Sequence, residues 1–126
     1  MLTTAKTLVA LVAAAHVGFM IFEMFFWTSA AAMRAFSMTP DFAAATAKFA
    51  KNQGLYNGFL AAGLIWALLS RRNTFALSVF FLSCVVIAGV YGAATLPKIE
   101  LVYFQALPAA LALLAVFAAA RGYELK

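Results

Sequence analysis

Residues 74–95 read TFALSVFFLSCVVIAGVYGAAT and contain no charged side chain. At about 1.5 Å per residue, a helix of this length crosses the ~30 Å hydrocarbon core of a bilayer. The stretch does not alternate between apolar and polar residues, as a membrane β-strand does. It therefore predicts a transmembrane helix.

Three further apolar runs of similar length flank this one, at about residues 7–28, 52–69 and 101–120. The first could be taken for a signal peptide, but it continues to Trp27 and is long enough to span, so we expect it to be retained. The predicted fold is all-α: a polytopic membrane protein with a single domain, residues 1–126, folded as an up-and-down four-transmembrane-helix bundle.

The composition agrees with a surface that faces lipid. Of the 126 residues, 67% are hydrophobic and 10% are charged, whereas about 25% are charged in an average globular protein. The net charge is +5, but the basic residues stand one to three at a time beside apolar runs, so we expect no nucleic-acid partner. The single cysteine, Cys84, excludes an intramolecular disulfide.

The segment between the first two runs predicts a helix start at Thr39-Pro40-Asp41, which offers a hydroxyl cap, a proline in the first turn and an acid near the positive helix end. The alanine-rich residues 40–51 that follow include Lys48 and Lys51. We predict an interfacial helix there.

Four crossings place both termini on the same side of the membrane. The bases on that side are Lys6, Arg71, Arg72, Arg121 and Lys126, and those on the other side are Arg34, Lys48, Lys51 and Lys98. Arg71-Arg72 is the tightest cluster in a short loop, which favours cytoplasmic termini.

Polar side chains inside the apolar runs are the candidates for function. They are His16, Glu23 and Trp27 in the first run, Asn52, Gln53, Tyr56 and Asn57 in the second, Tyr91 and Thr95 in the third, and Gln105 in the fourth. Up-and-down connectivity places all of them except the deeper His16 in one leaflet. We therefore predict a polar pocket in that leaflet, with no metal and no cofactor.

Glu23 and His16 are the candidate catalytic residues. An ionised carboxylate in the middle of a spanning helix costs about 2.5–3.5 kcal/mol, so Glu23 is expected to face inward and to find partners. His16 precedes it by seven residues, which is about 20° short of two turns and about 10 Å along the axis. The pair could flank a ligand and transfer protons to it, but could not share one proton directly.

Structural interpretations compete with these. Asn52, Gln53 and Gln105 are more often hydrogen-bonding links between helices, and Gly54-x-x-x-Gly58 is a close-packing motif. Methionines at helical spacing after His16 usually belong to a core, and one histidine is a poor metal-ligand set.

Several motifs, spread over most of the chain, carry a family resemblance. They are His16, Phe19, Glu23, Phe26 and Trp27, then residues 52–64 (NQGLYNGFLAAGL), residues 89–92 (GVYG), Thr95, and residues 105–109 (QALPA). Together they resemble domain-of-unknown-function family 1304, small proteins of the bacterial inner membrane. The resemblance implies a four-helix inner-membrane protein and no established reaction.

Three functions remain open. The first is a one-leaflet polar pocket that binds a small or lipid-like ligand, with proton transfer by Glu23 and His16. The second is a dimeric proton-coupled exporter of small molecules, although the chain lacks an internal repeat. The third is a structural accessory subunit. The expected partners are membrane lipid, such a ligand, and a second copy of the chain; Gly54 and Gly58 could pack either within the chain or between two copies.

Overall fold

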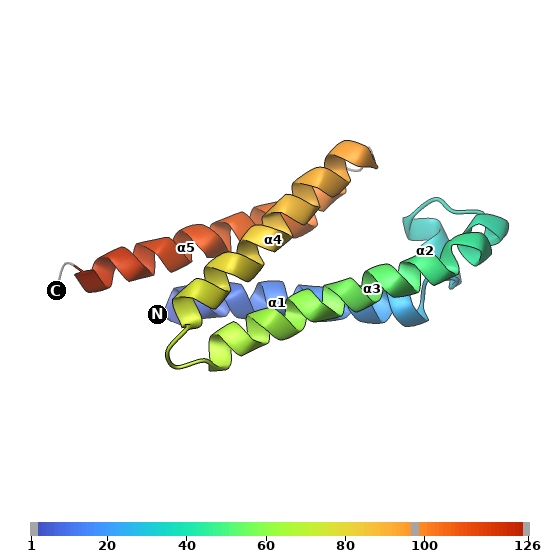
Figure 1. Cartoon of the computed structure of the whole chain (residues 1–126). Coiled ribbons are helices and arrows are strands. Elements are labelled where there is room, and N and C mark those ends of the chain that lie inside the picture. The colour runs from blue at the N-terminus through green and yellow to red at the C-terminus, as the bar shows by residue number, and fades with distance from the viewer. Residues whose placement is uncertain (1–2, 97–98, 125–126) are drawn as a thin grey trace. The chain divides into compact units, whose positions relative to one another are not determined.

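The computed structural model describes residues 3–96 and 99–124, and within these ranges it contains helices and no strand (Figure 1). Its elements are α1 (Thr3–Phe25), α2 (Ala30–Ala35), α3 (Pro40–Leu69), α4 (Thr74–Thr95), the π-helix η1 (Val102–Ala106) and α5 (Leu107–Glu124). Lys98 and Lys126, which entered the predicted topology, lie outside the described residues.

The chain forms two compact units. Unit 1 comprises residues up to Ala14 and from Leu60 onward, and unit 2 comprises Ala15–Phe59. Helices α1 and α3 each contribute residues to both units.

Three helices in the described part of the chain are long and apolar enough to cross a membrane: Thr3–Phe25, Thr74–Thr95 and Val102–Gly122. The prediction of an all-helical membrane protein is therefore confirmed at this level. Helix α3 is not among the three, because Asn52, Gln53 and Asn57 lower the hydropathy of its middle turns. The fourth transmembrane helix stays a prediction.

Helix α3 begins at Pro40, as the Thr39-Pro40-Asp41 triplet predicts, and Phe42 N donates to Thr39 Oγ1 at 3.3 Å. It then continues to Leu69 as one helix of 30 residues, which amounts to about 45 Å. That exceeds the thickness of the hydrocarbon core. If residues 52–69 cross the membrane, residues 40–51 extend beyond the core as part of the same helix.

Helix α1 ends slightly before the end of the first predicted run at about residue 28. The helix ends at Phe25, and a turn leads to Ser29, whose Oγ accepts a hydrogen bond from Ala32 N at 3.1 Å and so caps α2. After α2, Ser37 adopts a φ of 52°, the left-handed conformation that often ends a helix.

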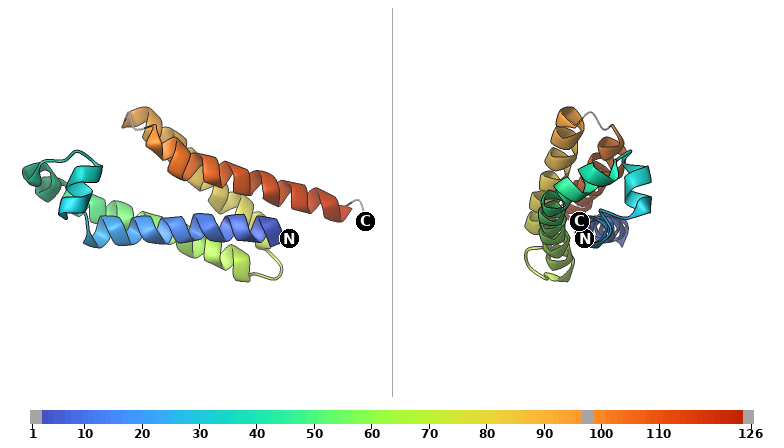
Figure 2. Two further views of the ribbon diagram at one scale, coloured as in Figure 1. Left: turned by 180° about the vertical axis from the view of Figure 1, so that it is seen from behind. Right: turned by 90° about the vertical axis from the view of Figure 1, so that its right-hand side faces the viewer.

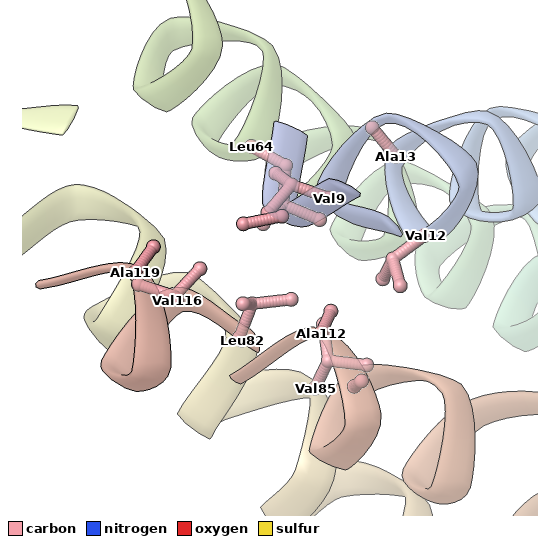
Figure 3. Close-up of a cluster of buried hydrophobic side chains, with 11 residues drawn as sticks. Val9, Val12, Ala13, Leu64, Leu82, Val85, Ala112, Val116 and Ala119 are labelled. Carbon is pink, nitrogen blue, oxygen red and sulfur yellow. The ribbon is translucent and has the colours of Figure 1, made fainter. Parts of the chain in front are cut away.

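The core of unit 1 is built from small apolar side chains (Figure 3). Its buried members are Ala5, Val9, Val12 and Ala13 of α1, Leu64 of α3, Leu82 and Val85 of α4, and Ala109, Ala112, Val116 and Ala119 of α5. The four on α5 recur every three or four residues and so form one stripe. Alanines in such a stripe let helix backbones approach closely, which favours packing in lipid.

Helix α4 packs along both η1 and α5 within unit 1 (Figure 2). A Cβ at Gly89 would lie 2.7 Å from Ala106 N and 2.9 Å from Ala106 Cβ, so the two backbones are nearly in contact. The π-helix has a cause in the sequence: Pro108 lacks an N–H, and its ring would collide with the carbonyl of residue 104 in a regular α-helix. A wider π turn just before the proline relieves that collision.

Candidate functional site

Unit 2 brings together two of the predicted site residues, Glu23 of α1 and Asn57 of α3. Asn57 Nδ2 donates a hydrogen bond to Glu23 Oε2 at 2.7 Å, a length typical of bonds to a charged acceptor. Asn57 is only 4% exposed, whereas Glu23 is half-buried. The carboxylate therefore has a partner inside the protein and remains partly accessible from outside.

Glycine makes this short bond geometrically possible. A Cβ at Gly54, one turn before Asn57, would lie 3.0 Å from Met20 O and 3.2 Å from Glu23 Cβ. A Cβ at Gly58 would lie 2.7 Å from Met20 Sδ. The Gly54-x-x-x-Gly58 motif thus lets α3 lie directly against α1, so that the side chain of Asn57 can reach that of Glu23.

The other polar residues at the start of the second run lie at different angles from Asn57 around the helix. Asn52 and Tyr56 point about 140° and about 100° away from Asn57, whereas Gln53, four residues before it, points only about 40° away. All three are exposed, and the Tyr56 ring packs edge-on against Phe59 with 5.9 Å between centroids. Of the four candidates in this run, Asn57 is the one that the structure pairs with Glu23.

Trp27 lies in the turn after α1, and its indole has partners in unit 2. Its Nε1 donates to Thr46 Oγ1 at 3.0 Å, and its ring packs against Phe36 with centroids 5.4 Å apart. Thr46 in turn donates to Phe42 O at 2.7 Å. Sequence reasoning missed Thr46, although a hydroxyl four residues after Phe42 in an otherwise alanine-rich segment was the available signal.

His16 lies in α1 and is 1% exposed. Its ring meets Phe19 edge-on, with centroids 5.4 Å apart and planes at 71°. A histidine shielded from solvent in this way would exchange protons only with groups that also enter the interior.

The three remaining candidates belong to unit 1. Tyr91 of α4 is 70% exposed, Thr95 Oγ1 donates to Tyr91 O in its own helix at 2.8 Å, and Gln105 is half-buried in η1. Because Glu23 and Asn57 belong to unit 2, a pocket that all these side chains share stays a prediction.

Metal binding has no evident site in the ranges 3–96 and 99–124, where no group of three or more His, Cys, Asp or Glu side chains could hold an ion. The side chains of Glu23 and Asn57 carry groups that form hydrogen bonds. A carboxylate offers about four acceptor positions, and an amide offers both donors and an acceptor.

Comparison with known proteins identifies a family. The model of a family described as "Protein of unknown function (DUF1304)" matches residues 10–117, a range that includes every candidate site residue. No curated protein and no solved structure matches the chain. Because the match covers most of the sequence, the protein belongs to the DUF1304 family of proteins of unknown function.

Proposed function

We propose that this membrane protein binds a small or lipid-like ligand through the carboxylate of Glu23 beside Asn57. The observation that supports the proposal is the 2.7 Å hydrogen bond between Asn57 Nδ2 and Glu23 Oε2. The bond fixes one carboxylate oxygen and leaves acceptor positions on a half-buried group. A ligand with a hydroxyl or N–H donor would occupy them.

The energetics of a membrane favour such a ligand. A carboxylate in an apolar environment is costly unless hydrogen bonds satisfy it, and one amide donor satisfies only part of its capacity. A polar headgroup or hydroxyl that reaches Glu23 would gain a strong, charge-assisted bond, while an apolar remainder would stay in lipid.

The other predicted residues complete the proposal. We assign further ligand contacts in the same leaflet to Trp27, Asn52, Gln53, Tyr56, Tyr91, Thr95 and Gln105. Proton transfer to the ligand is assigned to Glu23 and the buried His16. We place the protein in the bacterial inner membrane, with four crossings, cytoplasmic termini and a homodimer.

The test is native mass spectrometry of the detergent-purified full chain, comparing the wild type with Glu23→Gln. Glutamine keeps the size of the side chain and an oxygen that accepts from Asn57, so the packing survives while the charge is lost. We expect a bound molecule in the wild type and at least a tenfold lower occupancy in the variant.

Asp41→Asn is the matched control, because Asp41 is an exposed acid of the same unit, in the first turn of α3. It should retain the molecule. Equal occupancy in wild type and Glu23→Gln, or a wild type with nothing bound, contradicts the proposed site.

A structural accessory role is the second candidate, because the same bond, with the close approach at Gly54, also fastens α1 to α3 within unit 2. The two roles differ in how two variants behave. If the role is structural, Asn57→Ala lowers stability by about 1 kcal/mol, Glu23→Gln lowers it as well, and neither variant changes ligand binding.

A further inference from the structure

An open groove in unit 1 lies apart from Glu23 and Asn57. Its volume is about 250 Å³, and its lining residues are Arg71, Arg72, Thr74, Phe75, Val116, Ala119 and Ala120. Two arginines and a threonine therefore line the groove together with aromatic and aliphatic residues. None of these lining residues is acidic.

The arginines stand on a short, ordered loop between α3 and α4. Asn73 N donates to Ser70 Oγ at 3.0 Å, and Thr74 Oγ1 donates to Ser70 O, so side-chain bonds hold both ends of the loop. Arg71 and Arg72 are exposed. The groove is thus lined by two basic residues of an ordered loop, and planar guanidinium groups match the oxygens of a phosphate.

The ends of two apolar helices beside the groove indicate a position at the membrane surface. Thr74 and Phe75 open one apolar spanning helix, and Ala119 and Ala120 stand near the end of another, which closes at Gly122. Arg121 follows directly and is exposed. On α3, Trp66 is also exposed, and tryptophan is enriched at the level of lipid headgroups.

We propose that this groove binds the phosphate headgroup of an anionic phospholipid. Arg71 and Arg72 hold the phosphate oxygens, and the first part of an acyl chain lies along Phe75 and Ala120. Charge complementarity selects the headgroup, because basic pockets between membrane helices at this depth recognise anionic lipids. The apolar wall distinguishes a lipid from free phosphate, which has nothing to place there.

The test measures lipid binding to the full chain in nanodiscs that contain phosphatidylcholine with increasing phosphatidylglycerol. Bound lipid is counted by native mass spectrometry after mild release into detergent. We expect the double variant Arg71→Gln/Arg72→Gln to bind phosphatidylglycerol roughly thirty-fold more weakly than the wild type. Phosphatidylcholine binding should fall much less, because its positive choline group offsets the charge of its phosphate.

Two controls separate a groove from general charge. Lys48→Gln/Lys51→Gln also removes two positive charges, but from positions of α3 outside the groove. It should leave phosphatidylglycerol binding within about twofold of the wild type. Ala120→Leu fills the groove without changing charge and should weaken binding about tenfold. Circular dichroism checks that each variant is folded.

Equal losses in the arginine and lysine variants would overturn the proposal, since net charge would then explain binding. Unchanged binding in Ala120→Leu would overturn it too, because the apolar wall would have no part in it. Displacement of the lipid by millimolar inorganic phosphate alone would show a free anion as the occupant and would likewise contradict the assignment.

Discussion

Unit 1 and unit 2 hold their helices together through different kinds of contact. Unit 1 joins its helices through alanine and valine stripes and through Gly89 against the backbone of Ala106. Unit 2 joins α1 and α3 through Gly54 and then adds the Glu23–Asn57 and Trp27–Thr46 hydrogen bonds. An apolar side chain gains little free energy when it moves from lipid into the protein interior. Close approach of the helices and polar bonds between them therefore determine stability. The polar bonds between the helices of unit 2 are the ones for which the proposed ligand of Glu23 would compete.

The largest effect is expected where two backbones touch in unit 1. Gly89→Ala places a Cβ 2.7 Å from Ala106 N, and a backbone atom cannot move aside as a side chain can. We expect a loss of about 1–3 kcal/mol in the free energy of unfolding, measured by denaturant titration in detergent. Gly18→Ala is the control, because no atom lies within 4 Å of its Cβ position, and it should gain about 0.5–1 kcal/mol. A tolerated Gly89→Ala would mean that α4 and η1 are not in contact.

In unit 2 the two glycines of α3 should respond unequally. The Cβ of Gly54→Ala would meet Met20 O and Glu23 Cβ, whereas that of Gly58→Ala would meet only the flexible end of Met20. We expect Gly54→Ala to cost about 1–2 kcal/mol and to lengthen the Glu23–Asn57 contact, while Gly58→Ala costs less than half as much. Unfolding titrations measure the loss of stability, and the occupancy of the proposed ligand reports on the Glu23–Asn57 contact. Equal costs would contradict the close approach at Gly54.

The smallest effect concerns a polar group inside the apolar unit. Ser78 is buried in α4, and its Oγ has no hydrogen-bond partner in the described part of the chain. A buried hydroxyl without a partner is destabilising, so Ser78→Ala should be neutral or should raise the free energy of unfolding by up to about 1 kcal/mol. The control is Ser83→Ala on the same helix, at a half-buried position, which should change stability by less than about 0.5 kcal/mol. A clear loss of stability in Ser78→Ala would show that Ser78 makes a bond in the membrane.

Much of the fold could be predicted, since it follows from single-residue chemistry. Apolar runs of spanning length predicted the helices, and the Thr39-Pro40-Asp41 cap predicted the start of α3. The end of α1 could not be read in the same way. It depends on the turn that places Trp27 against Thr46 and Phe36, which are contacts between distant residues.

The candidate site was predictable as a set of residues but not as a geometry. The cost of an acid in lipid indicated that Glu23 needs a partner and that the second run offers amides. Which amide it meets depends on the rotation of α3, and that rotation is fixed by Gly54 against Met20 and Glu23 Cβ. The groove beside Arg71 and Arg72 was not predicted, because it depends on how α4 and α5 lie together.

The π-helix η1 has a consequence for how faces are assigned along the last membrane segment. A π turn holds one residue more than an α turn, so the side chains before it are rotated by about 100° from where an unbroken α-helix would carry them. Loss of a single residue from Val102–Ala106, combined with Pro108→Ala to remove the collision, would restore the regular winding and would turn Gln105 away from its present direction, leaving the stripe from Ala109 to Ala119 in place. The directions of the side chains before and after η1 can therefore be changed separately.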